Sequence, residues 1–174
     1  MPGFRHFLAY ALIAAGFLTP QAGQASCVEF GETCISNSDL KARIRIGEHT
    51  PELQELSQFT QLTELTLLAD LHFEEPVDLA PLAALGNLEK LALVNITAPD
   101  LAPITRLPGL KRLSLDSVRT ADFMPLSVMT RLEHLSVWGI EEVTDLGFVR
   151  GLTRLQSLNI ADSGVTDLSP LEGL

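Results

Sequence analysis

The sequence has few cysteines, few aromatic residues and few basic residues. Only two of its 174 residues are cysteine, 6% are aromatic, and 12 Lys and Arg residues stand against 22 acidic ones. The formal net charge of −10 argues against a nucleic-acid partner, because such a binder needs a basic surface to displace the counterions of the phosphates. The same charge disfavours adhesion to an anionic membrane surface. With so few aromatic residues, the core must be built from aliphatic side chains.

Motifs that would indicate catalysis are also missing. The sequence contains no G-x-S-x-G, no H-E-x-x-H and no P-loop. Three histidines, His49, His72 and His134, lie far apart in the chain. The two cysteines, spaced C-x6-C with no histidine nearby, make a poor zinc site, because tetrahedral zinc needs three or four such ligands. We therefore expect no enzymatic activity, no metal and no cofactor.

The only long apolar run lies at the N-terminus, in residues 7–18. A membrane span needs about 20 apolar residues, so this run is too short to be one. Arg5 and His6 precede the run, Pro20 follows it, and residues 23–25 offer small side chains at the −3 and −1 positions of a cleavage site. This order is typical of a secretory signal peptide. We predict that residues 1–25 are removed, leaving an exported chain, periplasmic or secreted, that has no transmembrane segment.

Cys27 has two interpretations. An exported chain meets an oxidising environment, so Cys27 and Cys34 can form a disulfide, which the chain-entropy model values at about 2.5 kcal/mol for so short a loop. Alternatively, residues 24–27 (QASC) resemble a bacterial lipoprotein box, in which the cysteine is lipidated, although Gln24 replaces the usual leucine. We favour the disulfide, a structural bridge that pins the N-terminus, and keep the lipid anchor as the alternative.

A repeat dominates the sequence from residue 62 onward. The pattern L-x-x-L-x-L begins at Leu62, Leu88, Leu110, Leu132 and Leu155, with Val137 and Ile160 in the last leucine slot of the fourth and fifth copies. A second marker, an aspartate followed in most copies by x-x-Pro, keeps the same period of 22 or 23 residues at Asp78, Asp100, Asp122, Asp145 and Asp167. A period of 20–29 residues with this leucine spacing is typical of a leucine-rich repeat.

Each repeat predicts one coil of a solenoid. The alternating leucines indicate a short strand with one buried face, and successive strands stack in parallel. The five aspartates are predicted to be N-caps of a helical or 3-10 turn on the convex side, not ligands of a metal. The fold class is therefore α/β, with a parallel sheet on the concave face. Stability is nearly a sum over neighbouring coils.

The last repeat, LQSLNIADSGVTDLSPLEGL at residues 155–174, resembles the internalin-type bacterial leucine-rich repeat. The resemblance covers residues 62–174 and implies a platform for a partner rather than a particular activity. The usual asparagine of that family is replaced, so we expect packing instead of an asparagine ladder, at Asp70, Ile96, Val118, Ile140 and Ser163. Four extra residues around 73–76 predict a bulging loop, and the fourth repeat lacks the proline.

The two ends of the solenoid differ. We expect residues 26–61 to cap the first coil, with an edge strand at residues 43–46 and a helix from Thr50 to about Gln58. Residues 62–174 form about five repeats, and no C-terminal cap follows Leu174. A solenoid normally needs a polar cap. The open face is therefore covered by a partner, or it self-associates, or the chain is an abbreviated product.

The alternation also predicts which strand residues face outward on the concave side. They form three columns: Glu64, Lys90, Arg112, His134, Ser157; then Thr66, Ala92, Ser114, Ser136, Asn159; then Leu68, Val94, Asp116, Trp138, Ala161. The middle column is a flat floor of short side chains. The only tryptophan is expected to project outward beside His134 and near enough to Arg112 to share one ligand. An exposed aromatic with a nearby arginine has the composition of an interface anchor.

These patterns predict a binding module rather than an enzyme. We expect the concave face to bind a protein or peptide partner through Lys90, Arg112, Asp116, His134 and Trp138. The alternative is an envelope-associated structural protein, lipid-anchored at Cys27, that docks through its uncapped C-terminal coil.

Overall fold

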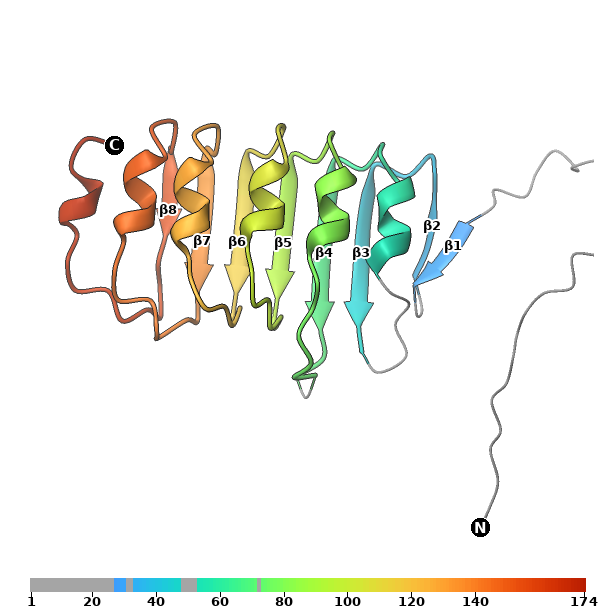
Figure 1. Cartoon of the computed structure of the whole chain (residues 1–174), viewed down its shortest axis with the longest axis horizontal. Helices are drawn as coiled ribbons and strands as arrows, with labels where there is room; N and C mark the ends of the chain where they lie inside the picture. The colour runs from blue at the N-terminus through green and yellow to red at the C-terminus, as the bar shows by residue number, and fades with distance from the viewer. Residues whose placement is uncertain (1–26, 31–32, 48–52, 72) are drawn as a thin grey trace, which may run out of the picture.

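The computed structural model describes residues 27–30, 33–47, 53–71 and 73–174 (Figure 1). The predicted signal peptide, the predicted helix start at Thr50, and two of the histidines, His49 and His72, lie outside these residues. Two sheets are present. A two-stranded antiparallel sheet joins β1 (Cys27–Phe30) to β2 (Thr33–Ser36). A six-stranded sheet follows in the order β3 to β8.

The six-stranded sheet is parallel throughout, and its strands succeed one another in sequence order. They are β3 (Lys41–Ile46), β4 (Glu64–Ala69), β5 (Lys90–Val94), β6 (Arg112–Asp116), β7 (His134–Trp138) and β8 (Ser157–Asn159). Parallel neighbours need a crossover, and here each crossover contains one 3-10 helix. This arrangement of one strand and one helical turn per coil confirms the predicted leucine-rich repeat solenoid.

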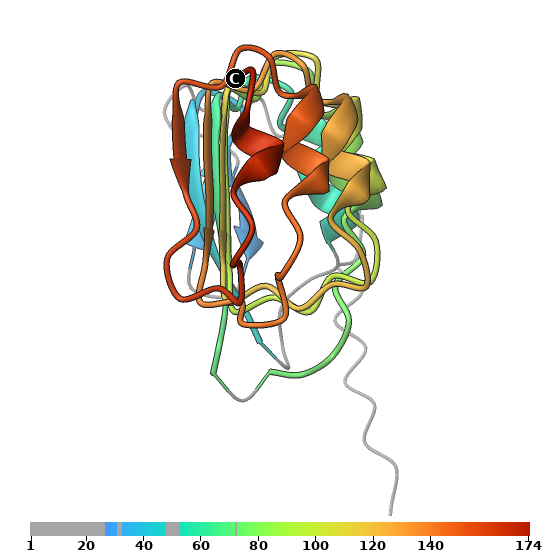
Figure 2. The same ribbon diagram turned by 90° about the vertical axis from the view of Figure 1, so that its left-hand side faces the viewer.

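The 3-10 helices all lie on one side of the sheet (Figure 2). They are η1 (Leu53–Gln58), η2 (Ala80–Ala84), η3 (Ala102–Arg106), η4 (Met124–Val128), η5 (Gly147–Gly151) and η6 (Ser169–Leu171). Their shortness suits the 3-10 form, whose poorer hydrogen-bond geometry limits its length. Helix η5 forms although its repeat lacks the proline, and Gly151 lets it approach η4, since a Cβ there would lie 2.1 Å from the Ser127 carbonyl oxygen.

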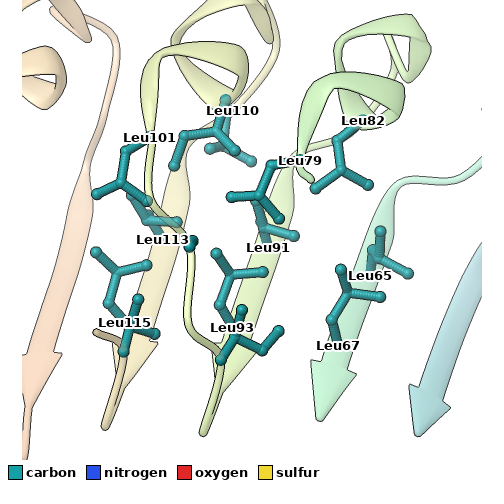
Figure 3. Close-up of a cluster of buried hydrophobic side chains, with 14 of the residues drawn as sticks. Leu65, Leu67, Leu79, Leu82, Leu91, Leu93, Leu101, Leu110, Leu113 and Leu115 are labelled. Carbon is teal, nitrogen blue, oxygen red and sulfur yellow. The ribbon is translucent and has the colours of Figure 1, made fainter. Parts of the chain in front are cut away.

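The core is a layer of aliphatic side chains between the sheet and the helices (Figure 3). The residues of each strand alternate between buried and outward positions. In β5, for example, Leu91 and Leu93 are 2% and 0% exposed, whereas Ala92 between them lies on the outer face. No polar or charged residue is buried among the described residues. Each coil therefore contributes hydrophobic burial, and each relies on its neighbours to cover it.

Each of the five aspartates lies one residue before the N-cap of its helix, whereas it was predicted to be the N-cap itself. The N-cap residue of each of these helices is the following leucine or phenylalanine, which makes no side-chain capping bond. The aspartate carboxylate instead accepts a hydrogen bond from the backbone N–H two residues on, at 2.7–2.8 Å, as in Asp78 to Ala80 and Asp100 to Ala102. This is an Asx-turn, which presets the bend into the helix.

The bend after each of the strands β5 to β8 uses a left-handed residue. Asn95, Ser117, Gly139 and Asp162 have φ between +52° and +67°, and the N–H groups of the first three donate to a carbonyl of the next coil. The aliphatic residue after each of the first three is buried, at Ile96, Val118 and Ile140. In the first repeat, Asp70 is exposed and pairs with Arg45. Packing therefore fills three of the five positions where the family has asparagine, whereas Asp70 forms an ion pair and the Ser163 hydroxyl donates to the Ile160 carbonyl.

The N-terminal end adds a coil of its own. Strand β3 pairs in parallel with β4 over its full length, from Lys41 opposite Glu64 to Ile46 opposite Ala69. Helix η1 buries Leu53 and Leu56, and Phe30 of the hairpin packs edge-on against Phe59 with centroids 6.1 Å apart. The repeat architecture thus begins at β3, inside the segment that was expected only to cap it.

The last coil is the least covered part of the solenoid. Leu132 and Leu135 are 0% and 1% exposed, whereas their counterparts Leu155 and Leu158 in the last coil are only partly buried. Leu168 is 56% exposed, and its counterpart Leu146 is buried. A coil packed on one side only leaves half of its aliphatic surface in contact with water.

Candidate functional site

The candidate site is the strand face, which we define as the outward side chains of β3–β8, opposite the 3-10 helices. No described element covers this face (Figure 2). Strand register aligns its side chains into three columns. The first column holds Lys41, Glu64, Lys90, Arg112, His134 and Ser157; the second holds Arg43, Thr66, Ala92, Ser114, Ser136 and Asn159; the third holds Arg45, Leu68, Val94, Asp116 and Trp138.

The predicted binding residues all lie on this face, but they are not all close together. Arg112 is paired with His134, and Asp116 is paired with Trp138. Because the first and third columns are four residues apart on each strand, about 13 Å separates Arg112 from the column of Trp138. Contrary to the expectation, Trp138 therefore does not lie beside His134 or near Arg112, because the second column separates them. A ligand that touches both Trp138 and Arg112 must cross the second column.

The second column forms the floor of a shallow groove. The groove has a volume of about 380 Å³ and runs across β4 to β8. Side chains of the first and second columns line it, and the floor residues Ala92, Ser114 and Ser136 are short. The only side-chain hydrogen bond between floor residues joins the Asn159 amide to the Ser136 hydroxyl, at 3.2 Å. Short side chains on neighbouring strands leave room for a chain to lie across the sheet.

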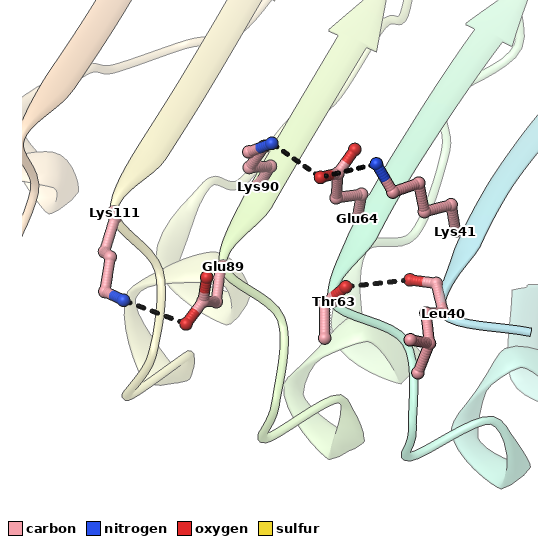
Figure 4. A network of polar contacts seen from close by, with 7 residues as sticks. All are labelled: Leu40, Lys41, Thr63, Glu64, Glu89, Lys90 and Lys111. Carbon is pink, nitrogen blue, oxygen red and sulfur yellow. Dashed lines mark hydrogen bonds and ion pairs between the residues drawn. The ribbon is translucent and has the colours of Figure 1, made fainter.

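A network of ion pairs crosses the first three strands of the face (Figure 4). Glu64 of β4 contacts both Lys90 of β5 and Lys41 of β3, the latter at 3.1 Å. Hydrogen bonds from Lys90 and then from Lys41 lower the pKa of the Glu64 carboxyl below its ordinary value. One carboxylate thus forms ion pairs with two ammonium groups, so Lys41, Glu64 and Lys90 together keep a net positive charge.

A second ion pair lies just outside the strands. The Lys111 ammonium contacts the Glu89 carboxylate at 2.8 Å, before β6 and β5 begin (Figure 4). This hydrogen bond lowers the pKa of Glu89 and raises the pKa of Lys111. Arg112, the next residue, is exposed and makes no ion pair with any described residue. Its guanidinium is therefore available to a ligand.

Trp138 is the large apolar side chain of the face. It is 40% exposed at the end of β7, and the two residues that flank it in the third column are Asp116 and, after β8, Ala161. The Asp116 carboxylate accepts a hydrogen bond from the Ser117 hydroxyl at 3.1 Å. Leu68 and Val94, in the same column, are partly buried. This column is therefore mostly apolar, whereas the first column is mostly basic.

Sequence reasoning missed the contribution of β3 to the face. Residues 43–46 lie in β3, which is an edge strand of the six-stranded sheet, as expected. Register also aligns Lys41, Arg43 and Arg45 with the three columns, which was not expected. The signal was present in the alternation of residues 41–46 (KARIRI), which buries Ile44 and Ile46 as the leucines of later strands are buried.

Among the described residues, no group of three or more His, Cys, Asp or Glu side chains could hold a metal ion. No helix in this part of the chain is long and apolar enough to cross a membrane.

Two solved structures share the architecture. An internalin (inlF) from Listeria monocytogenes matches with a TM-score of 0.65 and 23% identity, over 82% of this chain and 42% of its own. An internalin C2 (inlC2) from the same species matches with a TM-score of 0.55 and 22% identity, over 68% of this chain and 50% of its own. This chain thus spans half or less of their length. No family model and no curated protein matches the sequence. At these identities the likeness shows the internalin-type leucine-rich repeat fold.

Proposed function

We propose that this protein is an exported, non-enzymatic binding module that holds a protein or peptide partner on its strand face. One observation carries the proposal: Trp138, the only tryptophan of the chain, is 40% exposed on the same uncovered sheet face as Arg112, which makes no ion pair with any described residue. Tryptophan and arginine are the residues that most often dominate binding energy in interfaces.

The architecture supports the proposal. A solenoid presents an extended surface built from successive coils, and such surfaces are used for binding. The groove is lined by the basic first column and by the short side chains of the second column, and the mostly apolar third column lies beyond that floor. The internalin-type fold of the solved structures is consistent with a protein-interaction module.

Export is part of the same proposal. It rests on residues 1–25, whose order is typical of a signal peptide, and on the use of the two cysteines. We assign the disulfide of Cys34 to Cys27, because no other cysteine exists in the chain. The bridge would tie β1 to β2 beside the first coil.

A second candidate function is docking through the last coil by an envelope-associated protein, lipid-anchored at Cys27. The observation that favours it is the exposed aliphatic surface of that coil, where Leu168 and Leu174 are 56% and 44% exposed. Self-association through this surface should raise the apparent mass in sedimentation as concentration rises, and a Leu168→Ser variant should remain a monomer under the same conditions.

A photo-cross-linking experiment tests the first proposal. A photoreactive amino acid is placed at Ser157, an exposed residue of the first column, or at Thr153, an exposed residue that follows η5 outside the strand face. We expect one defined partner to be cross-linked in the native host through position 157 and not through position 153. Equal labelling at both positions, or labelling at 153 alone, contradicts binding on the strand face.

A further inference from the structure

Charge is distributed unevenly between the strand face and the rest of the molecule. The chain carries a formal charge of −10, yet only Glu64 and Asp116 among the described residues of β3–β8 place an acidic side chain on this face. The basic side chains on the same strands outnumber them: Lys41, Arg43, Arg45, Lys90 and Arg112. An acidic protein thus presents a face that is net positive, and such a surface selects an acidic ligand.

The positive charge is concentrated on one side of the groove. Three of the basic residues, Lys41, Lys90 and Arg112, belong to the first column. Glu64 is shared by the two lysines, and Arg112 has no ionic partner among the described residues. The Glu89 carboxylate, just outside the strands, also interacts electrostatically with Lys90 and Arg112. Within the described strands, the first column therefore carries three basic side chains and one carboxylate.

The third column, beyond the floor of the groove, is mostly apolar, and its side chains do not line the groove itself. Leu68, Val94 and Trp138 of the third column lie beyond the floor, and Asp116 is the only acidic residue among them. In an extended chain, successive side chains point to opposite sides, and alternate ones lie about 7 Å apart. A segment lying across the strands over the short floor would direct every second side chain to the basic column and the others to the apolar column.

We propose that the strand face binds an extended protein segment in which acidic residues alternate with apolar ones. Its carboxylates face Lys90 and Arg112, and its apolar side chains face Leu68, Val94 and Trp138. This inference rests on the proposed binding function and specifies the chemistry of the partner. Guanidinium and carboxylate groups form strong, charge-assisted hydrogen bonds, which gives Arg112 the leading part in selecting an acid.

A long phosphate polymer fits this surface poorly. Neighbouring strands lie about 4.8 Å apart, so a six-stranded face is only about 24 Å across, and a nucleic acid would continue past it. Beyond the face it would meet an acidic molecule, including the aspartates that precede η2 to η6. An acidic peptide can end within the basic area, and half of its side chains can use the apolar column.

The test uses Trp138 as the reporter. It is the only tryptophan of the chain and lies on the proposed site, so a tryptophan-free ligand can be followed by its fluorescence. The probe is a seven-residue peptide that alternates glutamate with valine, whose extended length of about 24 Å matches the face. It is compared with a peptide in which glutamine replaces every glutamate. We expect the glutamate peptide to bind at least about tenfold more tightly at 0.1 M salt, since several surface charge pairs contribute. The difference should shrink at 1 M salt, where the Debye length falls from about 10 Å to about 3 Å.

Three variants locate the site. Arg112→Gln removes a positive charge without breaking an ion pair of the described residues, and it should weaken binding of the glutamate peptide about three- to fivefold. Arg106→Gln removes an equal charge from η3, outside the face, and should leave binding unchanged. Asp116→Asn removes a negative charge from the face and should strengthen binding about twofold, an effect that structural damage would not produce.

Each other outcome overturns the inference. If both peptides bind with equal affinity, the face binds extended segments without selecting acids, and the proposed binding function survives. If the glutamate peptide fails to bind at millimolar concentration, the chemistry assigned to the partner is wrong, and the cross-linking experiment decides the binding function separately. If inorganic tripolyphosphate binds as tightly as the glutamate peptide and displaces it, the face is a general anion surface.

Discussion

The aspartate that precedes each of the helices η2 to η6 shows how one side chain can direct a bend. Its carboxylate oxygen accepts the N–H of the residue two positions on, at Ala80, Ala102, Met124, Gly147 and Ser169. This N–H would otherwise lack an intrahelical acceptor, because it belongs to the first residue of the helix. The repeated aspartate is thus explained by local hydrogen bonding, with no need for a metal ion.

Removal of one such carboxylate should destabilise the protein modestly. We expect Asp100→Ala to lower the free energy of unfolding by about 1 kcal/mol, as loss of a capping side chain does. Asp100→Asn, which keeps an acceptor oxygen, should lose less. Denaturant unfolding measures both. Calcium should leave the melting temperature unchanged, and a calcium-dependent rise that is absent in Asp100→Ala would make the aspartates metal ligands.

The paired Glu64 makes a prediction about pH. Because Lys90 and Lys41 lower its pKa in the folded protein, its contribution to stability is present above the unfolded pKa of about 4.3 and is lost as pH falls through the lower folded value. We expect Lys90→Gln to raise the Glu64 pKa in a carboxyl NMR titration. Lys111→Gln should raise the pKa of Glu89 instead and leave that of Glu64 in place. If the Glu64 pKa is the same in Lys90→Gln as in the wild type, this ion pair does not form in solution.

At the scale of the element, the strand and 3-10 turn of each coil depend on the neighbouring coils for their burial. Leu135 of β7 is covered on both sides and is 1% exposed. Leu158 occupies the same slot in β8, opposite Leu135, but has a neighbouring strand on one side only and is partly buried. Equivalent residues of a repeat therefore differ in stability contribution according to their place in the stack.

These two leucines provide a matched pair of variants. We expect Leu135→Ala to cost about 2–5 kcal/mol, because it leaves a cavity inside the stack. Leu158→Ala should cost clearly less, because its side chain already meets water and leaves no closed cavity. Comparison of the two unfolding free energies tests this. Equal costs would show that another element covers the last coil in solution.

The strands, whose leucines recur with a fixed period, could be predicted from the sequence, whereas the conformation of the bends after them could not. The alternation of leucines determined which residues of β4–β8 face the core, since a strand has a side-chain period of two. The left-handed conformation of Asn95, Ser117 and Gly139 was not predicted, because three different residue types occupy these equivalent positions. No single residue type therefore marks the bend in the sequence. The part played by Lys41 and Arg43 was missed because their strand precedes the first recognisable repeat.

At the scale of the whole molecule, most acidic side chains lie outside the strand face. The strand face combines a basic column, a floor of short side chains and a mostly apolar column, each continued across several coils by strand register. Sequence alone could place residues in columns. The columns already imply the distance between Arg112 and Trp138, because the first and third columns are four residues apart on each strand. The prediction that placed Trp138 beside His134 overlooked this spacing.

Export makes a prediction about the mature protein. We expect the chain to begin at Ser26 and to contain no free thiol, because we propose that its two cysteines, Cys27 and Cys34, form a disulfide. Intact mass before and after alkylation under native conditions measures both properties. A lipid adduct on Cys27 would favour the membrane-anchored alternative, and two alkylatable thiols would contradict the disulfide.

The central claim is that a partner binds on the strand face, and the substitution Trp138→Ala tests it most directly. The side chain is 40% exposed at the end of β7, outside the core, so the thermal midpoint should hardly change. Arg106→Ala, on the helix side, serves as the control and should change neither stability nor binding.

The measurement is the affinity of the cross-linked partner for Trp138→Ala, read beside the thermal midpoint of the same variant. The account predicts an unchanged midpoint and a loss of about 2 kcal/mol or more of binding free energy, as expected for an interface hot spot. A normally folded Trp138→Ala protein that binds its partner as tightly as the wild type would contradict the account.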